Sequence, residues 1–409
     1  MIKKTLILLS ILFVAQSSFA APNDWRKLNA FGGAKKERAI SFVIGNFGYV
    51  GTGVDTAEHV TKDFWQYNPG TDTWTQKANV PGTGRRDAVA FSIGTKGYVG
   101  MGIDSADFYW GGILNDFWEY DPAPNTWAPK NNFFTLNVTG VYFATAFVIS
   151  GKGYVCCGKI SQGTFYDDVY QYDPALDQWT FVSNFPGGAR YALNSCVINN
   201  KAYIGLGGDD NIMKQDWWEF NPVGYVWVQK SDFPPSPRMS ASCFSIGNFG
   251  YLCAGTDGGF NFDLWEYNPL NDNWVQRKNF PDNPRKSAVS FSIGNKGYFG
   301  TGKSDSGGRR DFWEYSQILE SVTDPPRSVS LRIFPNPASA SSIINISGNE
   351  TFKYKQLNYT LYDLAGSKID EKNIEDNKIE LPTNTKNGIY FIVIKNNNQI
   401  VNSAKISLL

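Results

Sequence analysis

DFWQYNPGTDTW, residues Asp63–Trp74, decides the fold because the chain repeats it. Later copies keep its Asp-x-aromatic start, its Asn/Asp-Pro turn and its closing Trp: DFWEYDPAPNTW (Asp116–Trp127), DVYQYDPALDQW (Asp168–Trp179), DWWEFNPVGYVW (Asp216–Trp227) and DLWEYNPLNDNW (Asp263–Trp274). A sixth copy starts at Asp311 but has Val322 where the others have the second Trp. Two short apolar runs around an Asn/Asp-Pro turn predict a β-hairpin.

A second pattern, F-x-I-G-x-x-G-Y-x-G-x-G, precedes these copies, for example FSIGNKGYFGTG at Phe291–Gly302. Its Gly-rich turn between apolar runs predicts another hairpin. The aromatic residue of this pattern recurs 49, 56, 49, 48 and 47 residues apart, at Tyr49, Tyr98, Tyr154, Tyr203, Tyr251 and Tyr298. A regular period with four strands in each unit predicts the blades of a β-propeller.

The missing half of the sixth unit lies at the N-terminus. In four complete copies a basic residue follows the last Trp by eleven residues: Trp74 to Arg85, Trp179 to Arg190, Trp227 to Arg238 and Trp274 to Arg285. Trp25 and Lys36 have the same spacing. The segment NDWRKLNAF is therefore expected to be the fourth strand of the last unit, so that the two ends of the repeat region close the ring and leave no open sheet edge.

These motifs resemble kelch repeats from Asn23 to about Gln317, although GxG stands where kelch repeats commonly have a Gly-Gly pair. The resemblance implies an all-β, six-bladed propeller closed by its N-terminal strand, over residues 21–318. Kelch propellers include enzymes and binding scaffolds, so the fold leaves the function open. Kelch-type galactose and glyoxal oxidases bind copper through histidines and tyrosines. The single histidine, His59, argues against that site.

The N-terminus is typical of an export signal over residues 1–20. Lys3 and Lys4 precede the apolar run Thr5–Val14, and Ser18–Ala20 is a small-x-small cleavage site. The run is too short to cross a bilayer, so no transmembrane segment is expected in a mature chain that starts at Ala21. Net charge is zero, which gives no indication of a nucleic-acid partner. The five cysteines, odd in number and irregularly placed, are predicted to be small buried hydrophobes in preference to a disulfide framework.

The tail beyond residue 318 has a different composition. A Pro-Pro linker over residues 319–328 precedes short strand-like runs that predict a small β-sandwich over residues 329–409. Its motifs resemble the type A C-terminal sorting domain of the type IX secretion system: IFPNPAS (Ile333–Ser339), LYDLAGSKI (Leu361–Ile369), NGIYFIVI (Asn387–Ile394) and the final AKISLL. The resemblance implies transit of the periplasm, recognition by that machinery, and a secreted or surface-bound product. An accessory carbohydrate-binding sandwich is the alternative.

Two sets of residues are candidates for a ligand site on the loop face of the propeller. The first is aromatic, and flat rings suit the stacking of sugars; its members are Phe108, Tyr109, Trp110, Phe133, Phe134, Phe165 and Tyr166. The alternative is that these loops bury their own aromatic side chains. The second set starts the innermost strands and could bind a carboxylate or phosphate: Lys36, Arg85, Arg190, Arg238 and Arg285, with Val141 breaking the series. The alternative for the second set is loop packing, which is common in kelch repeats.

No nucleophile elbow, phosphate loop or zinc motif is present, and no catalytic residue, metal or cofactor is predicted. Loop aspartates lack EF-hand spacing. The sequence therefore favours an exported ligand-binding propeller, with a glycan or a protein as ligand. A carbohydrate-active kelch enzyme such as a sialate mutarotase is the alternative. The enzyme should carry a buried acid beside the basic ring, whereas a binder needs only open aromatic and polar loops.

Overall fold

The computed structural model describes residues 23–105, 112–133, 140–161 and 163–317, and in the tail 332–334, 343–347, 357–363, 367–374, 378–382, 385–396 and 399–408. The expected signal peptide, the linker, the loop residues Phe108, Tyr109 and Trp110, and Phe134 lie outside this part of the chain. The described elements are β-strands, and no described segment is a helix with the length and hydropathy needed to span a membrane. The chain divides into two compact units, Met1–Gln317 and Ile318–Leu409.

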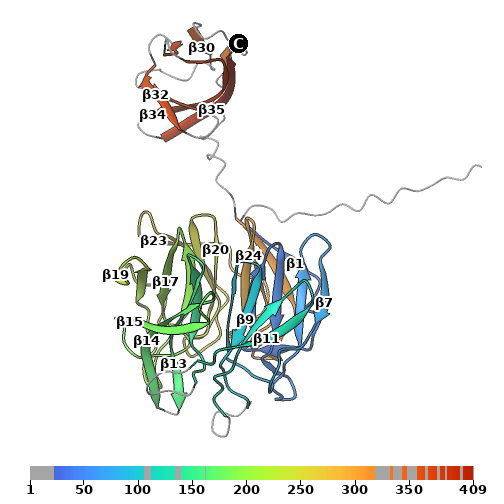
Figure 1. The fold of residues 1–409 in the computed structure, drawn as a ribbon. Helices are drawn as coiled ribbons and strands as arrows, with labels where there is room; N and C mark the ends of the chain where they lie inside the picture. Colours follow the sequence, from blue (N-terminus) through green and yellow to red (C-terminus); the bar gives the residue numbers. More distant parts are fainter. Residues whose placement is uncertain are drawn as a thin grey trace, which may run out of the picture. The chain divides into compact units, whose positions relative to one another are not determined.

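Six four-stranded antiparallel sheets stand side by side in the first unit (Figure 1). Sheet one contains β3 (Ile40–Ile44), β4 (Phe47–Gly51), β6 (Phe64–Asn68) and β7 (Thr73–Lys77); sheet two contains β8 (Val89–Ile93), β9 (Lys96–Gly100), β10 (Phe117–Asp121) and β11 (Thr126–Lys130). Sheet three contains β12 (Thr145–Ile149), β13 (Lys152–Ser161), β14 (Thr164–Asp173) and β15 (Gln178–Asn184). Each sheet is thus two successive hairpins, as the repeat predicts.

The remaining three sheets follow the same order. Sheet four contains β16 (Asn194–Ile198), β17 (Lys201–Gly205), β18 (Trp217–Asn221) and β19 (Val226–Lys230); sheet five contains β20 (Ser242–Ile246), β21 (Phe249–Cys253), β22 (Leu264–Asn268) and β23 (Asn273–Gln276). Sheet six contains β24 (Val289–Ile293), β25 (Lys296–Gly300), β28 (Phe312–Ser316) and β1 (Asp24–Leu28). Two short ladders join loops: β2 (Lys36–Glu37) with β5 (Val54–Asp55), and β26 (Lys303–Ser304) with β27 (Gly307–Gly308).

Sheet six is built from both ends of the repeat region. Strand β1 pairs with β28 in antiparallel register, and Trp25 lies opposite Tyr315. The Trp25 side chain is buried among aromatic rings, and its Nε1 donates a hydrogen bond to the Lys278 carbonyl at 3.0 Å. The N-terminal segment therefore occupies the position of the fourth strand that the sixth copy lacks.

A cycle of backbone hydrogen bonds joins the six sheets at one end of a central channel. One residue of each sheet donates its N–H to the equivalent carbonyl of a neighbouring sheet, at 2.9–3.3 Å: Arg38 to Ser287, Ser287 to Ser240, Ser240 to Ala192, Ala192 to Phe143, Phe143 to Asp87, and Asp87 to Arg38. All six have left-handed backbone, with φ between 51° and 58°. The shared conformation directs the backbone into the innermost strand of each sheet. We call these six residues the mouth ring.

Close contact between sheets explains the glycine that precedes five of the six repeat tyrosines; Ala202 precedes Tyr203. A Cβ on Gly97 would strike the Phe42 ring, and one on Gly297 would strike Phe244. The phenylalanine of one innermost strand therefore packs on the glycine of the next sheet. In sheet five the same glycine, Gly250, faces the smaller Cys196. These positions are constrained by packing between sheets.

Either glycine or cysteine stands at the fifth position of the second strand, and the residue opposite differs accordingly. Glycine faces an aromatic residue in four sheets: Gly51 with Phe64, Gly100 with Phe117, Gly205 with Trp217 and Gly300 with Phe312. Cys156 faces Val169, and Cys253 faces Leu264. The larger residue on one strand is thus offset by a smaller one on its partner. All five thiols are free, and four of them are buried.

The second unit contains two antiparallel sheets. One is β29 (Arg332–Phe334), β30 (Ile343–Ser347) and β33 (Lys378–Glu380); the other is β32 (Lys368–Asn373), β31 (Leu357–Tyr362), β34 (Gly388–Asn396) and β35 (Gln399–Leu408). Buried side chains from both sheets form one core, including Ile344, Ile379, Leu361, Ile392 and Ile406. Two sheets around a shared apolar core make a small β-sandwich.

Candidate functional site

The five basic residues at the start of the innermost strands are buried and paired with carboxylates. Each side chain is no more than 2% exposed, and each lies 2.5–2.9 Å from the aspartate that opens the DFW motif of its own sheet: Lys36 with Asp63, Arg85 with Asp116, Arg190 with Asp216, Arg238 with Asp263 and Arg285 with Asp311. The same cations donate to the backbone carbonyl that follows the second strand: Thr52, Met101, Leu206, Ala254 and Thr301. These bonds tie the first strand of a sheet to its second and third.

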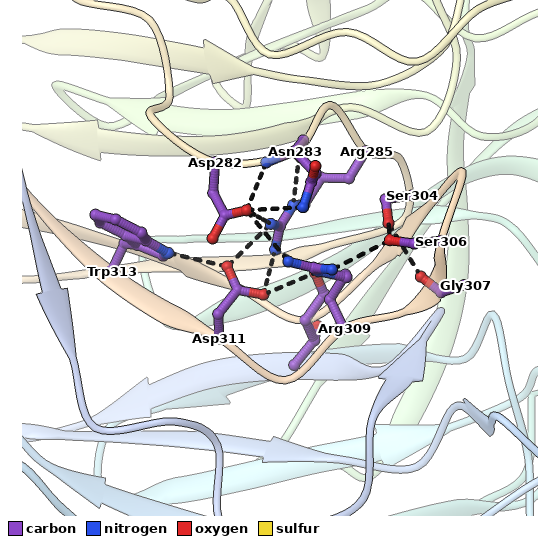
Figure 2. A network of polar contacts seen from close by, with 10 residues as sticks. Asp282, Asn283, Arg285, Ser304, Ser306, Gly307, Arg309, Asp311 and Trp313 are labelled. Carbon is purple, nitrogen blue, oxygen red and sulfur yellow. Dashed lines mark hydrogen bonds and ion pairs between the residues drawn. The ribbon is translucent and has the colours of Figure 1, made fainter.

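Figure 2 shows the arrangement in sheet six. The Arg285 guanidinium contacts both carboxylate oxygens of Asp311, and Oδ2 also accepts a hydrogen bond from Trp313 Nε1 at 2.9 Å. Burial raises the pKa of Asp311, but the bonds and charge of Arg285 outweigh that effect and lower it. Arg309 adds a second guanidinium, which reaches Asp282 at 3.2 Å. The charges of Arg285 and Asp311 are satisfied within the protein, which supports loop packing over capture of an acidic ligand.

The aromatic candidates do not form one surface within the described residues. Phe133 is 3% exposed and packs edge-on against Tyr170 and Trp179. Phe165 is half-buried and stacks on Tyr191 with ring centroids 5.5 Å apart. Tyr166 is half-buried beside Asp168. Phe133 is therefore a core residue, which favours self-burial for that member of the set.

Residues two and three positions after the basic position of each repeat surround a polar cavity at the channel mouth. Its volume is about 130 Å³, and its lining includes all six mouth-ring residues. The six ring residues are of five types: Arg38, Asp87, Phe143, Ala192 and the two serines Ser240 and Ser287. The backbone is repeated around the ring while the chemistry is not. Such variation on a uniform frame is typical of a binding site.

Cations predominate on the arc between sheets six and one. Arg38 lies 3.5 Å from Glu37 and 3.4 Å from Asp87, and its guanidinium stacks over the Phe143 ring at 5.1 Å. Lys303 pairs with Glu37 at 3.1 Å. Lys286 has no carboxylate within ion-pair distance among the described residues. Burial, followed by the charge of Arg38, lowers the pKa of Lys286.

One buried acid lies in the same ring. Asp87 is 9% exposed and contacts the guanidinium groups of Arg86 and Arg38. Burial raises the pKa of Asp87, and the charges of Arg38 and Arg86 oppose the rise without cancelling it. The catalytic alternative predicts a buried acid beside the basic ring, whereas the partners of Asp87 are Arg86 and Arg38, which are not members of that ring.

Aromatic rings cover the opposite arc, between sheets three and four. Lys159 Nζ lies over Tyr191 at 5.0 Å and over Phe165 at 5.2 Å, and pairs with Asp210 at 2.9 Å. Phe143 contacts Tyr191 with centroids 5.5 Å apart. Burial, together with the charge of Asp210, raises the pKa of Tyr191 to about 12. Phe143, which lines the mouth cavity, therefore links the aromatic rings of this arc to Arg38 on the cationic arc.

The comparisons with known proteins agree with the two units. The family "Secretion system C-terminal sorting domain" matches residues 332–408. Kelch-like protein 23 from Homo sapiens is 31% identical over 113 residues, which are 25% of this chain and 19% of that protein. Beta-scruin from Limulus polyphemus is 28% identical over 104 residues, which are 23% of this chain and 11% of that protein. The chain thus matches a minor part of these relatives' length.

A solved structure titled "Structure of YjhT" aligns with 72% of this chain and 98% of its own, with a TM-score of 0.61 and 16% identity. That likeness establishes the fold. The chain is a kelch-repeat β-propeller protein with a C-terminal secretion sorting domain. The sorting domain indicates export through type IX secretion to the cell surface or the medium.

Below its mouth, the channel of the kelch propeller widens into a second cavity. This cavity has a volume of about 310 Å³ and is lined by the six innermost strands. Some of its hydroxyls donate to backbone carbonyls, as where Ser41 donates to Ser290 and Ser290 donates to Cys243. Among the described residues, no group of three or more His, Cys, Asp or Glu side chains is placed to hold a metal ion.

Sequence reasoning missed the mouth-ring residues, although a signal for them was present. The repeat keeps a basic residue in five of six units, and the positions one and two residues later vary freely. Those variable positions supply Arg38, Asp87 and Phe143 to the mouth, and Glu37, which contacts Arg38. In a repeat protein the constant residues build the frame, so the variable neighbours of a constant residue are better candidates for a ligand site.

Proposed function

We propose that this exported kelch propeller binds an acidic glycan at the mouth of its central channel. The observation that carries the proposal is the cation cluster of Arg38, Lys286 and Lys303, which has the carboxylates of Glu37 and Asp87 as partners and lies beside the Phe143 ring. An anionic group placed there would relieve the repulsion between Lys286 and Arg38. Sugar C–H faces would pack on the neutral rings of the opposite arc.

The glycan is favoured over a protein ligand by the size of the site. A mouth cavity of about 130 Å³ accepts part of a sugar, whereas a stable protein interface buries a far larger and flatter surface. The charge favours acidic sugars, because a guanidinium and two ammonium groups suit carboxylates. Binding should therefore weaken as ionic strength rises.

A glycan array containing uronic-acid, sialic-acid and neutral glycans, probed with the isolated propeller, tests the proposal. Lys286→Ala should lower affinity for the acidic glycans about tenfold, the equivalent of about 1.4 kcal/mol. Lys77→Ala, on the outermost strand of sheet one, is the matched control and should leave affinity unchanged. Equal binding to neutral glycans, or full binding by the Lys286 variant, would refute the acidic-glycan proposal.

A second candidate is a kelch-type carbohydrate enzyme such as a sialate mutarotase. Asp87 favours it, because a buried acid with a raised pKa beside two arginines suits proton transfer to a sugar acid. The test is the exchange rate between anomers of free sialic acid, followed by NMR with and without protein. Acceleration that disappears in Asp87→Asn would support the enzyme; a rate equal to that of buffer would exclude it.

We also propose that the six sheets are the blades of one closed propeller, with β1 as the closing strand. The mouth-ring hydrogen bonds and the pairing of β1 with β28 support this proposal. Trp25→Ala should lower the free energy of unfolding by about 3–5 kcal/mol, the usual cost of emptying a buried tryptophan site. An unchanged denaturation midpoint would argue against closure by this strand.

For export, we propose that residues 1–20 are removed during passage into the periplasm and that residues 329–409 direct the second step. The match of residues 332–408 to the sorting family supports the second step. Deletion of 329–409 should leave a folded propeller in the periplasm. Recovery of that truncated protein from the medium or the cell surface would contradict the assignment.

A further inference from the structure

Sheet three lacks the buried cation that the other five sheets share. Val141 stands at the basic position, and Asp168 is the aspartate that the cation would meet. A small pocket lies between these two side chains, lined by Phe133, Val141, Val155, Cys157, Tyr166, Asp168 and Tyr170. It occupies the place that the charged end of Lys36 or of an arginine fills in each other sheet.

Three groups hold the cation in the other sheets, and sheet three keeps the equivalent of each. They are the aspartate of the DFW motif, the backbone carbonyl of the left-handed residue after the second strand, and in four sheets a phenylalanine ring 4.6–5.3 Å away: Phe31, Phe185, Phe233 and Phe280. In sheet three the corresponding residues are Asp168, Cys157, with φ of 62°, and Phe133. A complete cation cradle thus remains without its internal cation.

The carboxylate of this cradle has no cation among the described residues. Asp168 accepts hydrogen bonds from Asn184 Nδ2 at 3.0 Å and from the Tyr170 hydroxyl at 3.4 Å. No described Lys or Arg lies within ion-pair distance of it. Burial, followed by the negative charge of Asp167, raises the pKa of Asp168, so a bound cation would be favoured electrostatically.

We propose that the sheet-three pocket binds a primary alkylammonium group that comes from outside the chain. The pocket has a volume of about 10 Å³, enough for one water-sized group. This size suits an ammonium better than a planar guanidinium. The carboxylate of Asp168 and the Cys157 carbonyl supply acceptors, and the Phe133, Tyr166 and Tyr170 rings offer cation–π contacts. Tyr166 and Asp168 are half-buried and give the group a route from solvent.

The proposed site is separate from the channel mouth, because no residue lining this pocket lines the mouth cavity. A lysine side chain of a partner protein and a free polyamine carry the same chemistry. The ligand class is therefore defined by its ammonium group, and the two sources are separated by the choice of probe.

The test uses the full mature chain and measures binding of n-butylammonium chloride by NMR titration, with n-butanol as the neutral control. Butylammonium should bind at least tenfold more tightly than butanol, and Asp168→Asn should remove this preference. Val141→Arg, which rebuilds the motif of the other sheets, should abolish binding and raise the melting temperature. Equal affinity for the alcohol, or undiminished binding by Asp168→Asn, would overturn the proposal and leave a pocket that holds only water.

Two further arms complete the experiment. If Val141→Arg fails to fold, Val141→Lys introduces a smaller internal ammonium and should block the probe in the same way; a folded Lys variant that still binds butylammonium would contradict the proposal. Putrescine and a lysine-containing peptide separate the sources. Tighter binding of either one supports the proposal and identifies its source, and failure of both to bind would refute it. Loss of glycan binding in these variants is not expected.

Discussion

Sheet six contains the buried ion pair of the repeat unit, and sheet three has the same unit without it. In sheet six Arg285 is fully buried and paired with Asp311, and the Asp311 carboxylate also accepts a hydrogen bond from Trp313 Nε1. In sheet three the arginine is Val141 and the tryptophan is Tyr170, so two members of the set have changed together. Yet sheet three has four strands, and its first two pair in the same register as those of its neighbours, although β-bulges interrupt its other two pairings. The ion pair is thus not needed to form the hairpins.

The difference shows what the ion pair does. A buried charge is costly unless it is paired, so the arginine and the aspartate depend on each other for stability. Where the arginine is lost, the remaining carboxylate is bonded to Asn184 and stays half-exposed. Sheet three has replaced a closed electrostatic contact with an open, acidic pocket.

The largest expected loss of stability comes from removing the arginine of a buried ion pair. Arg238→Met keeps most of the volume but leaves Asp263 with only the Trp265 N–H, at 2.8 Å. Removing one partner of a buried ion pair typically costs about 3–5 kcal/mol. Urea unfolding of the propeller measures the loss. The double variant Arg238→Met/Asp263→Asn should recover most of it, because no charge is then stranded.

Sheet three supplies the control for that experiment. Asp168→Asn removes a carboxylate that has no cation to lose, so the free energy of unfolding should not fall. A drop as large as that of Arg238→Met would mean that Asp168 has a cationic partner in solution. The contrast between the two sheets would then be wrong.

An intermediate effect is expected where glycine faces an aromatic residue. A Cβ on Gly300 would lie 2.5 Å from the Asp311 carbonyl and would strike the Phe312 ring. Gly300→Cys should therefore destabilise the propeller by about 1–3 kcal/mol, as overpacking usually does. Adding Phe312→Leu copies the Cys253 and Leu264 pair of sheet five and should restore part of the loss.

A second glycine with open space around it is the control for the Gly300→Cys substitution. Gly259 has only Asp257 near its Cβ direction, at 3.9 Å, so Gly259→Cys should change the denaturation midpoint little. If Gly300→Cys is equally harmless, the packing rule for glycine and aromatic residues does not hold in sheet six.

Much of the fold followed from the sequence because packing repeats with the residues. The glycine before the tyrosine, the Asn/Asp-Pro turn and the Trp-to-basic spacing each recur in most units, because most sheets make the same contacts. The burial of Phe133 could also have been inferred. Phenylalanine stands six residues after the closing Trp of the repeat at Phe31, Phe185, Phe233 and Phe280, and Phe133 stands six residues after Trp127.

The candidate site was harder to predict, for a physical reason. Repeated arginines give the same sequence pattern whether they bind a ligand or pair with an aspartate of their own sheet. Here the aspartates stand 25–31 residues later, as in Arg238 with Asp263 and Arg85 with Asp116. Only the three-dimensional structure decides between these partners. Mouth-ring chemistry depends on residues that share no pattern, so Arg38, Asp87 and Phe143 carried no repeat signal of their own.

The smallest expected effect is a difference in pH dependence between the two kinds of sheet. In sheet six the pKa of Asp311 is lowered: burial raises it, and Arg285 more than compensates. A carboxylate with a lowered folded pKa stabilises the protein above its unfolded value, about 3.9, and that stability is lost as pH falls through the folded pKa. In sheet three burial and Asp167 raise the pKa of Asp168, so its ionisation destabilises the fold as pH rises above about 4. Unfolding free energies between pH 2 and pH 7 separate the two. Asp311→Asn should be less stable than the native chain at neutral pH, whereas Asp168→Asn should be slightly more stable, and both differences should shrink toward pH 2. If Asp168→Asn instead lost stability at neutral pH, its carboxylate would be paired as in the other sheets, and the comparison would fail at its central point.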